Sequence, residues 1–224
     1  MRFYKNVILL GLTFVTSLTF GQFKDNVDQV EMITEIQKWE KDSSKMTLSF
    51  WIPNSYWRIA LAGNPIGTEK TIKTIEDIFE DYVIVCAADI LIDGTAGITS
   101  TPDSILRNNI RVIDRKGKKY YALAEADLSS ELALMLINIQ PMFAKMFGQM
   151  GSGMYFYAFE VKDKKGNNLI DETKEGEFVV AHSNTIFKWR LPLVSLLENK
   201  ICLEDNEEMK GNWKFCPFHG VELK

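Results

Sequence analysis

The chain has 224 residues, of which 46% are hydrophobic and 25% are charged, and its formal net charge at pH 7 is −4. This length and balance are those of one generous globular domain, or one domain with a small appendage, with enough apolar residues for a core. The acidic net charge disfavours nucleic acid and anionic membrane surfaces as partners, because both repel a negatively charged protein.

Residues 1–21 have the pattern of a signal peptide. Arg2 and Lys5 supply a positive start, and the stretch 7–20 is uncharged and mostly apolar. This stretch is shorter than the roughly 20 residues that span a bilayer, which favours cleavage over a membrane anchor. Cleavage would leave 24 Lys and Arg against 30 Asp and Glu. We expect an exported protein, periplasmic or secreted, that is not transmembrane after cleavage, and the lack of an Asn-x-Ser/Thr acceptor in the sequence favours a bacterial source.

Hydrophobic periodicity predicts most elements of the body, residues 22–197. The stretches with helical spacing of apolar residues are 26–39, capped by Asp25 or Asn26, then 71–80 and 102–108. The stretches with the alternating or continuous apolar character of strands are 46–52, 56–62, 82–92, 177–181 and 185–189. Two aromatic pairs, at 50–51 and 56–57, are predicted to anchor the core; exposed, they would instead suit stacking on a sugar or a peptide.

A D-x-x-G motif occurs twice between apolar stretches, first at Asp114 and Gly117 and again at Asp163 and Gly166. Asp opens a turn through its side chain, and Gly accepts the positive-φ position that closes a hairpin. The two predicted hairpins span 110–121 and 155–171. Together with the other strands they predict a β-rich α+β fold with a β-sandwich-like body.

A helical insertion of about 127–150 lies between these hairpins. Ser129 or Ser130 can cap a helix that runs to about Gln140. Pro141 cannot continue the helical hydrogen bonds, so it either kinks this helix or begins a second one. We expect the insertion to lie across the sandwich.

Three methionines of this insertion, Met142, Met146 and Met150, recur every four residues and would share one helix face. Thioethers select copper(I), which makes a metal-handling protein, for copper or zinc, the alternative function. The same spacing with Phe143 and Phe147 is typical of core packing, and this interpretation is favoured.

Catalytic patterns are scarce. His182 lies in a predicted turn beside Ser183, without the G-x-S-x-G context of a serine hydrolase. Cys86 lies in a continuous apolar stretch, where it is expected to be a small buried hydrophobe. The sequence therefore predicts a protein that is not an enzyme, and a hydrolase that uses His182 is the weakest alternative.

The most specific chemical pattern lies in the tail, residues 198–224. Cys202 and Asp205 form a C-x-x-D pair, and Cys216 and His219 form a C-x-x-H pair. Two intervening residues let both side chains of a turn reach one ion, and Cys, Asp and His all bind zinc. The predicted metal ligands are therefore Cys202, Asp205, Cys216 and His219.

The second half of this pattern, Phe-Cys-Pro-Phe-His-Gly-Val-Glu-Leu, resembles the closing knuckle of zinc-ribbon domains, F-C-P-x-C-G-x-x-L. His219 stands where the second Cys usually is. The first half departs further, because Leu203 replaces the proline and Asp205 takes the second ligand position. The resemblance covers about residues 200–224. It implies a structural zinc ion with four ligands and no open position for a substrate.

Two alternatives to zinc remain open. In an oxidising compartment Cys202 and Cys216 can form a disulfide, which leaves Cys86 unpaired. The tail can also pack without any metal. In either case we expect a non-enzymatic binding or scaffolding protein of the cell envelope, with a metal or a disulfide as a clip at its C-terminus. Its partner would be an unknown protein or envelope component.

Overall fold

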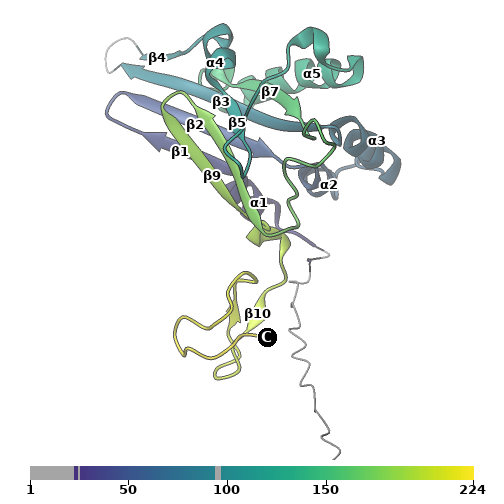
Figure 1. Ribbon diagram of the computed structural model, residues 1–224, viewed down its shortest axis with the longest axis vertical. Coiled ribbons are helices and arrows are strands. Elements are labelled where there is room, and N and C mark those ends of the chain that lie inside the picture. The colour runs from purple at the N-terminus through teal and green to yellow at the C-terminus, as the bar shows by residue number, and fades with distance from the viewer. Residues whose placement is uncertain (1–22, 25, 94–96) are drawn as a thin grey trace, which may run out of the picture.

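The computed structural model describes residues 23–24, 26–93 and 97–224 (Figure 1). The predicted signal peptide, the proposed cap Asp25 and the turn at 94–96 lie outside the described residues. Within the described ranges, no helix has both the length and the apolar character needed to cross a membrane.

The elements form a mixed, β-rich α+β fold, as the sequence predicts, and every pairing between the described strands is antiparallel. The α-helices are α1 Gln29–Ile36, α2 Ser55–Leu61, α3 Glu69–Phe79, α4 Asp103–Asn109 and α5 Ser130–Phe147. The strands are β1 Gln37–Lys41, β2 Lys45–Ile52, β3 Tyr82–Asp93, β4 Gly97–Ser100, β5 Arg111–Ile113, β6 Lys119–Tyr121, β7 Tyr155–Glu160, β8 Gly176–His182, β9 Thr185–Leu191, β10 Lys200–Ile201 and β11 Glu208–Met209. The short 3-10 turns are η1 Glu125–Asp127, η2 Gly151–Gly153 and η3 Val194–Leu196.

The larger sheet is built around β3. Strand β2 pairs along one edge of β3, and β1 pairs with β2. The other edge of β3 is shared, because β7 pairs with Tyr82–Ala87 and β4 pairs with Ile90–Asp93. Residues 83–88 of β3 are buried, including Cys86, which is 0% exposed. The predicted central strand and the buried cysteine are therefore confirmed.

The smaller sheet has the strand order β6-β5-β8-β9 and packs on the larger one through aromatic side chains. The ring of Trp51, on β2, lies 4.7 Å from that of Phe178 on β8 and 6.1 Å from that of Trp189 on β9. The indole N–H of Trp189 donates to the carbonyl of Ile36 at 3.1 Å. One core therefore joins the two sheets and α1, and Trp51 is a core anchor, as predicted.

The stretch 56–62 is helical, so the strand predicted there is wrong. Helix α2 occupies Ser55–Leu61, and Trp57 stacks on Phe79 of α3 with ring centroids 4.4 Å apart. Short apolar stretches fit a strand or a helix equally well, and tertiary contacts decide between them. Here the decisive contacts are made with α3 and with Glu172.

Helix α1 is shorter than predicted, because the chain turns directly into β1 after Ile36. Trp39, expected on the apolar face of a helix, lies in β1 opposite Leu48 and is 60% exposed. The cap is Asp28, whose carboxylate accepts the N–H of Glu31, and not Asn26. Pairing with β2 outweighs the helical spacing of this stretch.

Helix α5 is a single helix that continues through Pro141. The predicted cap is present, since the hydroxyl of Ser129 accepts the N–H of Leu132 at 3.2 Å. The helix ends at Gly148, which has a φ of 58°. Figure 1 shows α5 at the periphery of the body, beside β7.

Both D-x-x-G motifs form turns, but only the first joins two full strands. The carboxylate of Asp114 accepts two backbone N–H groups in the β5–β6 hairpin. Asp163 makes the same bonds, yet the chain beyond it pairs only through the isolated bridge of Lys162 with Asn168. The expected strand at 168–171 is therefore reduced to one bridge.

Candidate metal centre

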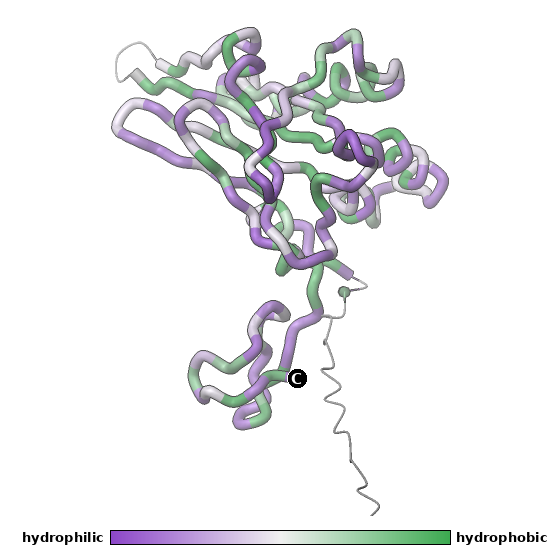
Figure 2. Tube along the Cα trace, viewed as in Figure 1, coloured by the Kyte–Doolittle hydropathy of each residue, from purple (hydrophilic) through white to green (hydrophobic). Residues whose placement is uncertain are grey.

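The tail lies apart from the two sheets, and one segment of the chain connects it to them (Figures 1 and 2). It contains two short hairpins. Strands β10 and β11 pair in the first, and a bridge between Phe215 and Glu222 closes the second. Each hairpin carries one of the predicted ligand pairs in its turn.

The two turns have the same backbone hydrogen bond although their sequences differ. The N–H of Asn206 donates to the carbonyl of Cys202 at 2.8 Å, and the N–H of Gly220 donates to that of Cys216 at 2.9 Å. Asn206 and Gly220 both adopt a positive φ, of 60° and 69°. Asn tolerates this conformation better than most residues, and Gly adopts it freely. Each turn thereby folds back around its cysteine.

Three predicted ligands converge between the turns. One donor atom from each of Cys202, Cys216 and His219 lies within 4.8 Å of the others. Nδ1 of His219 is 3.5 Å from Sγ of Cys202 and 3.6 Å from Sγ of Cys216. Zinc bonds of about 2.3 Å to sulfur and about 2.0 Å to nitrogen, at a tetrahedral angle, separate the two donors by roughly 3.5 Å. The two sulfur–nitrogen distances are therefore those expected of donors that share one ion.

The fourth predicted ligand, Asp205, lies at the edge of this cluster. Its Oδ2 is 3.4 Å from Nδ1 of His219, but Asp205 is not among the residues whose donors all lie within 4.8 Å of one another. Its Oδ1 accepts the N–H of Glu207 at 3.0 Å. Asp205 therefore has a structural role in its turn and one oxygen directed toward the site.

The sulfur atoms of the site are enclosed, and its imidazole and carboxylate are partly open. Cys202 and Cys216 are 0% and 2% exposed, whereas the side chains of His219 and Asp205 are 40% and 30% exposed. The three cysteines of the described residues are free thiols. Together with His219, the sulfurs of Cys202 and Cys216 lie close enough to bind one metal ion.

Local hydrogen bonds favour an anionic sulfur at Cys216. Burial would raise the pKa of this thiol, but backbone N–H groups of His219 and Phe218 outweigh burial and lower it. Burial raises the pKa of Cys202, and the hydrogen bond with Cys216 raises the pKa of His219. Thiolate is the form that binds metals, so of the two cysteines Cys216 ionises more readily to the form that can bind an ion.

The regular methionine spacing of the predicted insertion does not continue along one helix. Met150 lies beyond Gly148, where the helix ends, so it does not share a helix face with Met142. Met142 is 61% exposed, whereas Met135 and Met150 pack against the body core. The expectation that Met142, Met146 and Met150 share one face is therefore wrong.

His182, expected in the turn between two strands, is the last residue of β8, and its side chain is 0% exposed. Its Nε2 is 3.5 Å from the carboxylate of Asp89. This carboxylate also accepts hydrogen bonds from the hydroxyls of Thr47 at 2.9 Å and Ser183 at 2.5 Å, and it forms an ion pair with Lys45 at 2.8 Å. Burial lowers the pKa of His182 and so favours its neutral form. Asp89 is the one charge among apolar residues 82–92, a sign of a buried ion pair that the sequence reasoning missed.

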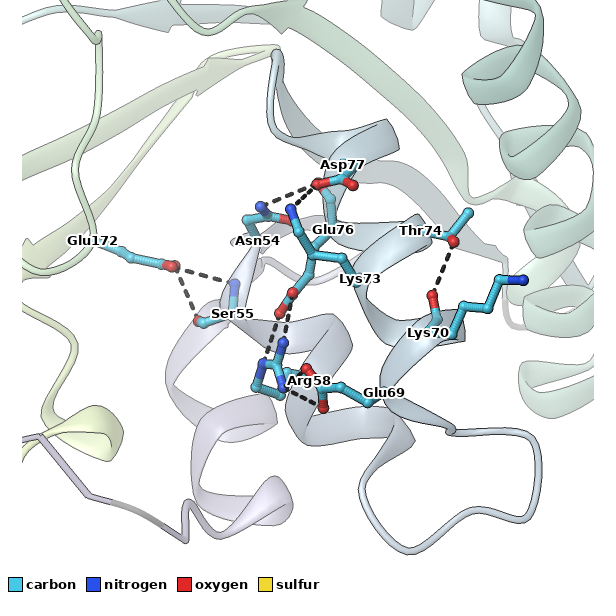
Figure 3. Close-up of polar contacts among 10 residues, drawn as sticks. All are labelled: Asn54, Ser55, Arg58, Glu69, Lys70, Lys73, Thr74, Glu76, Asp77 and Glu172. Atoms are coloured by element: carbon cyan, nitrogen blue, oxygen red, sulfur yellow. Dashed lines mark hydrogen bonds and ion pairs between the residues drawn. The ribbon is translucent and has the colours of Figure 1, made fainter.

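A second polar cluster joins α2 to its neighbours (Figure 3). The carboxylate of Glu172 accepts the N–H and the hydroxyl of Ser55 at 3.2 and 3.1 Å, and burial raises the pKa of Glu172 to about 7. Arg58 pairs with Glu69 at 3.0 Å and Glu76 at 2.8 Å, both on α3. The polar groups of this cluster bind one another, so we assign it a structural role in holding α2 against α3 and the segment of Glu172. The tail is therefore the candidate functional site.

No family model matches this chain, and no curated protein and no solved structure matches it.

Proposed function

We propose that this chain is an exported, non-enzymatic binding or scaffolding protein of the cell envelope, and that its tail is a structural zinc clip of the ribbon type. The observation that carries the proposal is the convergence of Cys202, Cys216 and His219 within 4.8 Å. Two thiolates and an imidazole in tetrahedral arrangement are the donor set typical of zinc. Asp205, 3.4 Å from the imidazole of His219, would complete the four ligands.

A structural role for the ion follows from the size of the tail. Its buried side chains are Cys202, Met209, Cys216 and Leu223, with Trp213 and Val221 packed around them. A unit this small buries too little apolar area to fold on that contribution alone. Metal binding supplies folding free energy in such units, and burial of both sulfurs leaves the ion little access to a substrate.

The body supports a binding or scaffolding role. We interpret it as a β-sandwich-like unit, because aromatic rings of β2 contact those of β8 and β9 across the two sheets. The one histidine of the body, His182, is fully buried and held near Asp89, which leaves it unsuited to act on an external substrate. The body would therefore act through its surfaces, with an envelope protein or component as its partner.

Elemental analysis of the purified mature protein, residues 22–224, tests the metal part of this proposal. We expect one zinc per chain, and we expect two thiols to become reactive when a chelator removes it. Absence of metal together with a single free thiol under denaturing conditions would show a disulfide between Cys202 and Cys216 and would refute the zinc clip.

Two variants of Asp205 separate its possible roles. Asp205→Asn keeps an oxygen that can accept the N–H of Glu207, whereas Asp205→Ala removes it. If Asp205 is the fourth ligand, both variants bind zinc more weakly than the parent chain, in competition with a chromogenic chelator. If Asp205 only supports the turn, Asp205→Asn binds as well as the parent and only Asp205→Ala is weakened.

A further inference from the structure

The outer face of α5 is apolar and exposed along most of the helix. Leu134, Ile137 and Met142 are 61%, 66% and 61% exposed, and Pro141 between them is exposed as well. The opposite face holds the helix on the body through its buried and partly buried residues, among them Leu132, Met135, Leu136, Ile139 and Phe143. A helix with apolar residues on both faces is typical of one that is covered on both.

Five exposed residues of α5 are ordered symmetrically about Asn138. Leu134 and Met142 lie four residues to either side of it, and Glu131 and Lys145 lie seven residues to either side. All five are exposed and fall on one face, because steps of three and four residues follow the helical repeat. At 1.5 Å per residue, each charged residue lies roughly 10 Å along the axis from Asn138, in opposite directions.

This order is self-complementary. If a second α5 packs antiparallel about a two-fold axis at Asn138, Glu131 of one copy meets Lys145 of the other at both ends. Leu134 then meets Met142, and the two Asn138 side chains meet at the centre. Such a pairing is the isologous arrangement of a two-fold dimer, and a central Asn is a known device for setting helix register.

We propose that the outer face of α5 is a homodimer interface, in which the helices of two copies pack antiparallel about Asn138. Charge complementarity favours a second copy over a lipid surface, since this face carries one acid and one base and the whole chain is acidic. Figure 2 shows α5 coloured largely as hydrophobic at the periphery of the molecule, away from the tail. The interface does not depend on the metal in the tail.

Mass measurement by light scattering and sedimentation, over a range of concentrations of residues 22–224, tests the dimer. We expect the parent chain to be a dimer that dissociates on dilution and Leu134→Glu, which places a charge at the contact with Met142 of the other copy, to be a monomer. Ile105→Glu is the control, because Ile105 is also an exposed aliphatic residue on a helix, at 52% exposure on α4. A parent chain that is monomeric at every concentration, or a dimer that Leu134→Glu leaves intact, would overturn the proposal.

Charge reversal tests the antiparallel register itself. Glu131→Lys and Lys145→Glu each place like charges together at both ends, so each should raise the dissociation constant about tenfold. An equimolar mixture of these two variants restores opposite charges at both ends, and so does the double variant. Recovery of dimer in the mixture supports the register, and no recovery refutes it. A monomeric parent that floats with phosphatidylcholine–phosphatidylglycerol vesicles would assign the face to lipid instead.

Discussion

The body and the tail are held together by different means. The body buries aromatic and aliphatic side chains from two sheets and their helices in one cluster, whereas the tail buries Cys202, Met209, Cys216 and Leu223. Two of these four tail residues are candidate metal ligands. We therefore expect apolar burial to decide the stability of the body and a metal bond to decide that of the tail.

Loss of a ligand should affect only the tail, and it is the largest effect we expect. Structural zinc sites contribute about 10–16 kcal/mol of binding free energy in small domains, far more than the tail core can replace. In Cys216→Ser, we expect the amide of Cys202, which donates to Glu207 in the first hairpin, to lose its protection from hydrogen exchange. Amides of β3 should exchange as slowly as before, which mass spectrometry of the two segments can show.

Phe218→Ser is the matched control for that experiment, because Phe218 is in the same turn and is 74% exposed. It should retain both metal and protection. Equal protection of the tail in Cys216→Ser and in the control would mean that the tail folds without a metal, and the contrast between the two regions would then be lost.

Truncation of a core aromatic should show the reverse pattern. Trp51→Ala removes the ring that contacts Phe178 and Trp189 across the sheets, and it should lower the free energy of unfolding of the body by about 3–5 kcal/mol. Zinc content should stay at the parent level while the body is folded. Trp39→Ala, at a residue that is 60% exposed, should change stability by less than about 0.5 kcal/mol. Urea titration of both variants measures the difference.

The same contrast explains which parts of the molecule were predictable. The ligand pairs of the tail depend on turns of four residues, so the sequence spacing places the two donors of each pair in one turn, and three of the four donors lie together in the structure. Strand β3 was also predictable, because its continuous apolar stretch suits a strand buried on both faces. In both cases the deciding interactions are local or depend on composition alone.

The errors occur where distant residues decide. Helix α2 is held at its first residue by Glu172, 117 positions further along the chain, and no local pattern carries that information. The partner of Asp89 at Ser183 is 94 positions away, so the buried charge was visible in the sequence but its partners were not. Asp205, the fourth predicted ligand, lies outside the cluster of the other three donors and also accepts a hydrogen bond within its own turn.

The smallest expected effect concerns Glu172, and it should be confined to the body. Burial raises the pKa of this carboxyl from 4.5 to about 7, so the folded state holds its proton more tightly than the unfolded state does. Its stabilising contribution is then complete below about pH 4.5 and is lost as the pH rises through about 7. Glu172→Gln keeps an oxygen that can accept hydrogen bonds from Ser55 and carries no charge. The melting temperature of the variant minus that of the parent should therefore be larger at pH 8 than at pH 5.

Melting curves of parent and variant at these two pH values test this directly. Glu175→Gln, at an exposed glutamate three positions away, is the control and should follow the parent at both. A constant difference between Glu172→Gln and the parent would show that Glu172 is ionised in the folded state throughout. In that case the hydrogen bonds from Ser55 outweigh burial, and the carboxylate acts as a charged cap on α2 that stabilises the body by electrostatics as well as by apolar packing.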